Sequence, residues 1–113
     1  MNQAQELHRE AMQLAHEAFV AQNGGEPKRF LELSKMALEK ERAAAWLLFD
    51  QLDAEPTRSI LFRSAAHLAF NCGFMRETEQ LIAAALAGNP PAEIIQELRQ
   101  LSKSVLAAFD QAA

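Results

Sequence analysis

Two side chains near the middle of the sequence have the types and the spacing to bind an anion. Arg63 and His67 lie four positions apart, and this spacing places both side chains on one face of a helix. They are also the main polar residues in an otherwise apolar stretch. A guanidinium or imidazolium group there can bind the carboxylate of a peptide terminus or of an acidic side chain. The alternative is an internal ion pair between Arg63 and one of three carboxylates: Glu17, Glu41 or Glu55.

The other side chains that could bind a metal or act as a nucleophile are poorly spaced for either task. His8 and His16 are eight positions apart, about 80° around a helix, whereas a metal site prefers histidines three or four positions apart with a carboxylate close by. Cys72 is the only cysteine, and His67 five residues earlier does not make a catalytic dyad by itself. We therefore expect no catalytic residue, no metal and no cofactor, and we do not expect an enzyme.

Composition excludes several classes of protein. The 113 residues are enough for one domain, and 50% hydrophobic with 23% charged residues is a globular composition. A net charge of −4 argues against a nucleic-acid binder, which normally carries a basic stripe. No apolar run approaches the length of a membrane span. The N-terminus lacks the order of a signal peptide, and a single cysteine fits a reducing compartment, so we expect a cytoplasmic protein.

The elements that must position these side chains are helices. Ala, Leu, Glu and Gln dominate, Tyr is absent, and Val and Thr are scarce, which favours helices over strands. Glycine and proline divide the chain at Asn23–Gly25, at Pro56, at Cys72–Gly73 and at Gly88–Pro91. The sequence therefore predicts an all-α fold with about five helices, at approximately 3–22, 27–51, 56–71, 75–87 and 91–111.

The second and third of these helices have unusual apolar patterns. The third helix is apolar almost all round, which predicts a place in the middle of the fold. The second is long, and its end carries four consecutive large apolar residues, from Trp46 to Phe49. We expect this end to overhang its partner helix. It then either covers the core against the third and fifth helices or forms a self-association surface that includes Trp46, Leu48 and Phe49.

Two segments of the sequence repeat a common pattern 48 positions apart. The first runs from Leu14 to Leu38 and the second from Phe62 to Leu86. The identical residues of the first segment, each with its counterpart 48 positions later, are Ala18, Ala21, Asn23, Gly25, Leu33, Ala37 and Leu38. Repeated helical units usually build a surface that binds another protein.

The second segment resembles a tetratricopeptide repeat, a helix–turn–helix unit of 34 residues. The matches to that pattern are Phe62, Ala66, Gly73, Ile82, Ala85, Leu86 and Pro90; the departures are Ala65, Ala69, Met75 and Thr78. The first segment matches less well, at Ala18, Gly25, Ala37 and Leu38. We expect its second helix to be about 14 residues longer, which would account for the period of 48 in place of 34.

The resemblance implies a right-handed α–α superhelix built from antiparallel hairpins at 3–52 and 56–88 and closed by a capping helix at 91–111. It also implies that the first helix of each unit lines a concave groove. The groove residues would include Met12, Phe19, Arg63, His67, Phe70 and Asn71. In members of the family that bind peptide termini, Lys, Arg and Asn hold the carboxylate, and here only Arg63 and Asn71 suit that role.

The function predicted from this pattern is protein–protein interaction, as an adaptor or accessory regulator that is able to self-associate. The alternative is a helix bundle that binds a small ligand or a metal between its helices. An open groove between helices would favour the first function. A closed pocket lined by His8, His16 or His67 together with carboxylates would favour the second.

Overall fold

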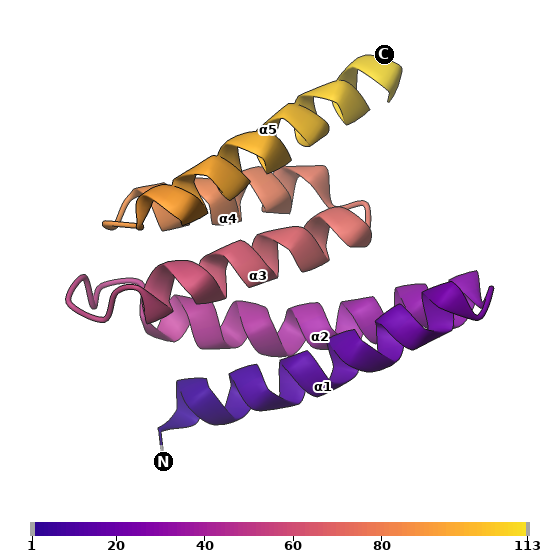
Figure 1. Ribbon diagram of the computed structural model, residues 1–113, viewed down its shortest axis with the longest axis horizontal. Helices are drawn as coiled ribbons and strands as arrows, with labels where there is room; N and C mark the ends of the chain where they lie inside the picture. The colour runs from indigo at the N-terminus through magenta and orange to yellow at the C-terminus, as the bar shows by residue number, and fades with distance from the viewer. Residues whose placement is uncertain (1, 113) are drawn as a thin grey trace.

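The computed structural model describes residues 2–112, which form five α-helices and contain no strand (Figure 1). The helices follow one another through a single stack, with the two ends of the chain on opposite sides of it. Helix α2 packs against α1 and α3, and α4 packs against α3 and α5. Helix α5 also contacts α3. The helices are α1 (Gln3–Asn23), α2 (Pro27–Leu47), α3 (Thr57–Asn71), α4 (Met75–Leu86) and α5 (Ala92–Ala112).

Local backbone chemistry explains most of the helix boundaries. The side-chain oxygen of Asn2 accepts a hydrogen bond of 2.7 Å from the backbone N–H of Gln5 and caps the start of α1. Pro27 occupies the first position of α2, where a missing N–H costs nothing. Gly25 and Gly73, which follow α1 and α3, have φ angles of 73° and 82°. Glycine adopts this left-handed conformation without steric cost, so the chain can turn back directly after each helix.

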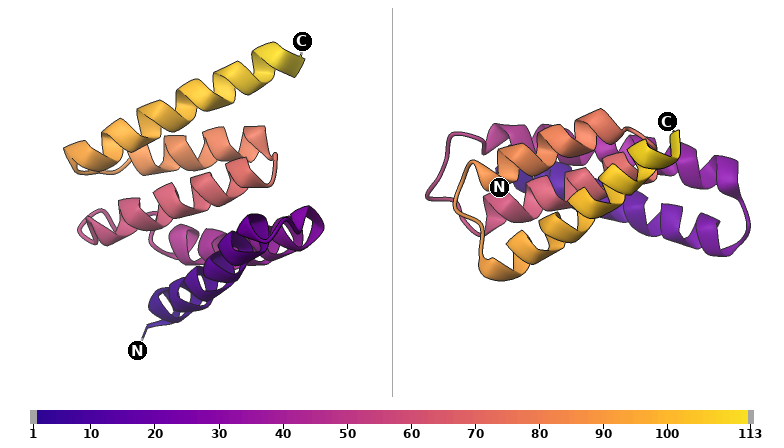
Figure 2. Two further views of the ribbon diagram at one scale, coloured as in Figure 1. Left: turned by 45° about the vertical axis from the view of Figure 1, so that its right-hand side comes forward. Right: turned by 90° about the horizontal axis from the view of Figure 1, so that it is seen from above.

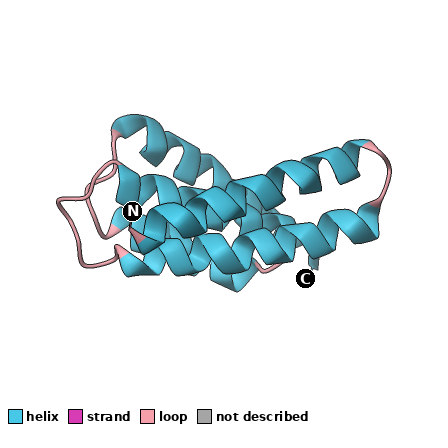
Figure 3. Cartoon of the chain, turned by 90° about the horizontal axis from the view of Figure 1, so that it is seen from below, coloured by secondary structure: helices cyan, strands magenta, loops and turns pink. Residues whose placement is uncertain are grey.

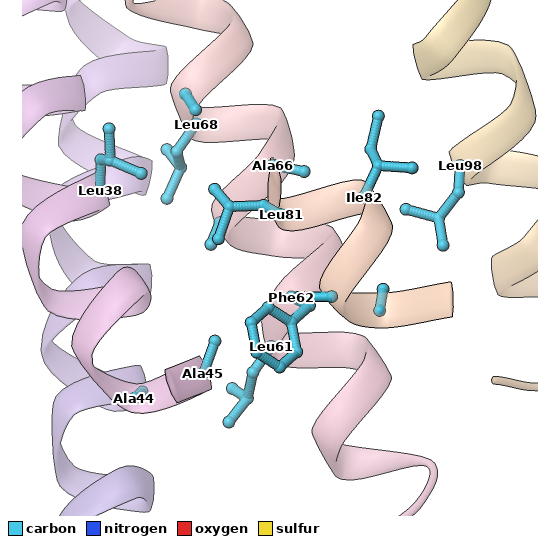
Figure 4. Packing of buried hydrophobic residues seen from close by; sticks show 14 of the residues in the cluster. Leu38, Ala44, Ala45, Leu61, Phe62, Ala66, Leu68, Leu81, Ile82 and Leu98 are labelled. Carbon is cyan, nitrogen blue, oxygen red and sulfur yellow. The ribbon is translucent and has the colours of Figure 1, made fainter. Parts of the chain in front are cut away.

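The main core lies on both sides of α3 (Figure 4). Phe62 is fully buried there, and its ring and the Trp46 ring form a T-shaped pair with centroids 5.0 Å apart. Ala66 and Ala85 are also fully buried, which suits the close approach of α3 and α4. The central position expected for the third helix is confirmed, and α5 lies at the end of the stack against α4 and α3.

The expected extension of the second helix to Gln51 is wrong, because α2 ends at Leu47. The N–H groups of Leu48 and Phe49 bond to carbonyls only three residues back, in a tight turn. The carbonyl of Phe49 then accepts a hydrogen bond of 2.9 Å from Nε of Arg58. Leu48 and Phe49 therefore fold back onto the main core. The residues that lengthen the first unit lie in two places. Helix α2 has 21 residues, against 12 in α4, and the loop at 48–56 follows it.

The first two helices project from the stack at the end where α1 turns into α2, away from the loop between α2 and α3 (Figures 2 and 3). There the α1–α2 turn extends beyond α3 and α4. A small second cluster holds this end together, formed by Ala18, Ala21 and Leu33 with Leu14 and Phe30 packed against it. Phe19 lies outside this cluster and is 58% exposed.

Candidate functional site

Three of the predicted groove residues line one hollow between α3 and α5. The hollow has a volume of about 430 Å³. Phe70 and Leu101 belong to the main core and form its apolar part. Its other residues are polar and exposed. The full lining is His67, Phe70 and Asn71 from α3 with Glu97, Gln100, Leu101 and Ser104 from α5.

Arg63 lies next to this hollow and forms an ion pair across the two helices. Its Nη1 is 3.2 Å from Oε2 and 3.3 Å from Oε1 of Glu97. The internal ion pair considered from the sequence therefore forms, but its partner is on α5 and is none of the three carboxylates expected from the sequence. Glu97 is exposed, so the pair lies open to solvent at the rim of the hollow.

His67 is a weaker base in this setting than a free histidine. Desolvation lowers the pKa of His67 and outweighs the attraction of Glu97, while the positive charge of Arg63 lowers it further. At neutral pH the ring is therefore mainly uncharged. It offers one donor and one acceptor to a partner and does not provide a fixed cation.

The remaining predicted residues lie elsewhere. Met12 and Phe19 are on α1 and are not among the residues that line the α3–α5 hollow. Trp46 packs against Phe62 and Phe49 yet remains 44% exposed. Leu48 and Phe49 are half-buried against the main core. Self-association through these three residues stays a prediction.

A second hollow lies where the start of α1 meets the loop between α2 and α3. Its volume is about 320 Å³. Six polar side chains and four small or branched apolar ones line it, and one of the polar ones is a histidine. The lining residues are Asn2, Ala4, Gln5, His8, Leu48, Gln51, Ala54, Glu55, Thr57 and Leu61.

A buried carboxylate holds the histidine of this second hollow. Nδ1 of His8 lies 2.9 Å from each carboxylate oxygen of Glu41, and Glu41 is fully buried between the helices. Burial raises the pKa of the Glu41 carboxyl, and the hydrogen bond from His8 opposes that rise without cancelling it. The sequence pattern does not indicate this pair, because its two members are on different helices, 33 positions apart.

The raised pKa of Glu41 predicts a pH-dependent contribution to stability. Its ordinary value is 4.5. Above that pH the unfolded chain loses the proton while the folded chain still holds it, so the contribution of this group to the free energy of unfolding falls as pH rises through the folded pKa. The variant Glu41→Gln has no group that titrates at this position, so it does not lose stability in this way as the pH rises. We expect its stability relative to the natural protein to increase from pH 4.5 towards neutrality, as measured by urea denaturation at a series of pH values.

The matched control for this prediction is Glu39→Gln, because Glu39 is on the same helix and is exposed. Its stability relative to the natural protein should change little over the same pH range. Parallel profiles for Glu41→Gln and Glu39→Gln would contradict the prediction.

Arg58 is a second fully buried charged group next to this hollow, and it organises the loop there. Its guanidinium donates to the carbonyls of Phe49 and Ala84 at 2.9 Å each and of Ala85 at 3.4 Å. It also lies over the rings of Phe49 and Phe62, at 5.3 and 5.1 Å from their centroids. Arg58 thus ties the turn after α2 to the end of α4, where exposed carbonyls favour a cation.

Glu55 completes this arrangement. Its carboxylate lies 3.8 Å from Arg58 and accepts hydrogen bonds from the backbone and hydroxyl of Ser59 and from the backbone of Asn89. Burial raises the pKa of Glu55, but these hydrogen bonds outweigh burial and lower it overall. The spacing of Glu55 and Arg58 at the start of an apolar helix is the sequence signal that could have indicated this structural role.

Three other features were sought within residues 2–112: a metal site, an activated thiol and a membrane-spanning helix. No group of three or more His, Cys, Asp or Glu side chains is placed there to hold a metal ion. Cys72 is half-buried, and this burial raises the pKa of its thiol, whereas an activated thiol needs a lowered one. None of the helices in this range combines the length and the apolar character needed to cross a membrane.

Comparisons with known proteins do not indicate a function for this chain. No protein-family model matches the chain, and neither a curated protein nor a solved structure matches it significantly. The two hollows are therefore the features from which a function is inferred.

Proposed function

We propose that this protein binds another protein or a peptide through the α3–α5 hollow, as an adaptor or accessory regulator. The observation that carries the proposal is the convergence of His67, Phe70 and Asn71 on one hollow of about 430 Å³. An apolar centre surrounded by polar side chains is the usual anatomy of a protein-binding surface. The polar rim of this hollow comes from both helices, so a partner would contact α3 and α5 together.

The chemistry of the hollow indicates how a peptide would be held. Phe70 and Leu101 would receive an apolar side chain, and Asn71, Gln100 and Ser104 would bond to peptide backbone groups. An exposed ion pair such as Arg63–Glu97 contributes only about 0–1 kcal/mol. Arg63 can therefore exchange Glu97 for a carboxylate of the partner at little cost.

The proposal includes a repeat architecture in which α1–α2 and α3–α4 are tetratricopeptide-like hairpins and α5 is the capping helix. The order of contacts along the stack and the left-handed Gly73 between α3 and α4 support it. In that architecture α1, α3 and α5 are equivalent helices and would face the same groove. Phe19, which is exposed on α1, would then extend the binding surface. A cytoplasmic location is part of the same proposal.

A charge placed in the hollow should abolish partner binding without unfolding the protein. Gln100 is exposed on α5 and lines the hollow, so Gln100→Arg fills this space with a long cationic side chain. We expect the variant to capture its specific partners from an extract of the native host at least about tenfold less efficiently, as measured by quantitative mass spectrometry.

The control is Gln80→Arg, because Gln80 is exposed on α4 and is absent from the lining of the hollow. This control should capture partners like the natural protein, and both variants should retain their thermal unfolding temperatures. Equal capture by Gln100→Arg and the natural protein would refute binding through the α3–α5 hollow.

A second candidate function, the binding of a small ligand between helices, is favoured by the hollow beside His8. This hollow brings a histidine together with Glu55, and Glu41 holds the same histidine from the other side. A pocket of about 320 Å³ lies at the lower end of the range for small-molecule sites, about 300–1,000 Å³.

A further inference from the structure

We propose that the hollow beside His8 binds a small carboxylic acid with a compact apolar body, through Nε2 of His8. This inference rests on the second candidate function and is independent of protein binding at the α3–α5 hollow. It commits to a ligand class because a carboxylate can accept hydrogen bonds from Nε2–H of a protonated His8, from the amide of Asn2 and from the hydroxyl of Thr57, which all line this hollow.

The histidine is oriented for this role before a ligand arrives. Both oxygens of the buried Glu41 carboxylate lie 2.9 Å from Nδ1 of His8, so Nδ1–H donates to Glu41. The ring atom left for a ligand is Nε2. In the imidazolium form Nε2–H is a donor, and Glu41 neutralises the ring from its other side. A ligand carboxylate would then complete a chain of carboxylate, imidazolium and carboxylate.

The carboxylate that lines the hollow already has hydrogen-bond donors. The oxygens of Glu55 already accept from Ser59 and Asn89 and lie close to Arg58. The side-chain oxygen of Asn2 accepts from the backbone of Gln5, which leaves the amide N–H groups of Asn2 as donors. A ligand that brings acceptors therefore fits this hollow better than one that brings donors.

Further donors come from the start of helix α1, where Ala4 lines the hollow. First-turn N–H groups that have no partner within the helix favour an anion. At the start of α3, by contrast, the N–H groups of residues 58–60 are already bonded. The hydroxyl of Thr57 adds another donor. No lysine or arginine lines the hollow, so His8 is its single side chain able to carry a positive charge.

The remaining surface of the hollow selects the body of the ligand. Ala4, Leu48, Ala54 and Leu61 supply an apolar wall. A volume of about 320 Å³ accommodates one aromatic ring or a short branched chain. Benzoate combines such a body with one carboxylate and is therefore a suitable probe. Benzyl alcohol and benzylamine have the same ring with a neutral or a cationic group.

The test is a titration of the isotopically labelled protein with each of the three probes, followed by the amide shifts in two-dimensional NMR spectra. Benzoate should produce saturable shifts at residues 2–8, 48–55 and 57–61. Benzyl alcohol and benzylamine should bind at least about tenfold more weakly, because neither offers a carboxylate to the donors.

Two variants test the role of the hollow, and one serves as a control. His8→Asn keeps an amide N–H in the place of Nδ1 to bond Glu41 but removes Nε2, and it should weaken benzoate binding at least about tenfold. Ala54→Leu should weaken it similarly by filling the apolar part. His16→Asn is the matched control, since His16 is exposed on the same helix and outside this hollow, and it should leave benzoate binding unchanged.

The possible results separate the inference from the function on which it rests. Equal binding of benzylamine or benzyl alcohol at the same residues would overturn the carboxylate class but keep a small-ligand function. No shift at these residues with any probe would overturn both. Unchanged benzoate affinity in folded His8→Asn would overturn the role of Nε2. If His8→Asn does not fold, unchanged affinity in Ala54→Leu would overturn the site.

Discussion

Replacement of Arg58 by methionine is expected to lower the free energy of unfolding by about 3–5 kcal/mol, the usual cost of breaking a buried, paired charge. Arg58 is fully buried and donates to three backbone carbonyls. Methionine keeps most of the side-chain volume but leaves these carbonyls without their donor. It also leaves the carboxylate of Glu55 without its neighbouring cation. Urea denaturation followed by circular dichroism measures the loss.

Three further variants define the cause of this loss. Arg58→Lys should recover little, because one ammonium group cannot reproduce the planar fork that reaches Phe49, Ala84 and Ala85. Gly88→Ala should also destabilise, because a Cβ at that position would overlap the guanidinium of Arg58. The exposed Arg29 serves as the control, and Arg29→Met should change stability by less than about 0.5 kcal/mol. A similarly small loss in Arg58→Met would contradict the proposed role of the buried guanidinium.

Truncation of Phe62 to alanine is expected to cost about 3–5 kcal/mol, as is typical for a fully buried phenylalanine. Phe62 lies on α3 and contacts the ring of Trp46 at the end of α2 and that of Phe49 in the turn after it, with centroids 5.0 and 6.3 Å away. The ring therefore joins two neighbouring parts of the stack. Its loss leaves a cavity that the surrounding helices can only partly close.

Trp46 provides a direct optical measurement for this prediction. It is the only tryptophan and forms a T-shaped pair with the Phe62 ring, so its fluorescence should change in Phe62→Ala before any denaturant is added. Phe109→Ala is the control, because Phe109 is 41% exposed, and it should cost less than about 1 kcal/mol. Equal losses for the two variants would show that the core is not organised around Phe62.

The two hollows are connected by one helix. Helix α3 begins with Thr57 at the edge of the hollow beside His8 and ends with Asn71 in the hollow against α5. Phe62 and Arg58 hold the first half of α3 in place. Variants at either residue should therefore also be tested for binding at both hollows. A variant that lowers stability without changing binding would separate the structural core from the two sites.

Local chemistry made the helix boundaries predictable. Four of the five helices begin and end within one or two residues of the expected positions, at capping groups, glycines and prolines. The exception is the end of α2, which stops at Leu47 although the run of large apolar residues continues to Phe49. There the hydrogen bond from Arg58 to Phe49 opposes local propensity, and its donor lies nine positions further along the chain.

The candidate site was predictable only as far as one helix extends. His67, Phe70 and Asn71 all lie on α3, and the resemblance of that segment to a tetratricopeptide repeat was what grouped them as groove residues. Their neighbours on α5 could not be inferred, because the helix that covers a given face depends on tertiary packing. The pairing of Arg63 with Glu97 is an example, since the two residues are 34 positions apart.

The sequence by itself determined an all-α chain, the number of helices and most of the apolar face of each. These properties depend on backbone propensity and on a period of 3.6 residues, which act over a few neighbouring positions. Only the tertiary structure decided that Glu41 meets His8, that Arg58 is buried, and that two hollows form at opposite ends of α3. Those contacts depend on the rotation and offset of whole helices, which the combined packing of the core sets.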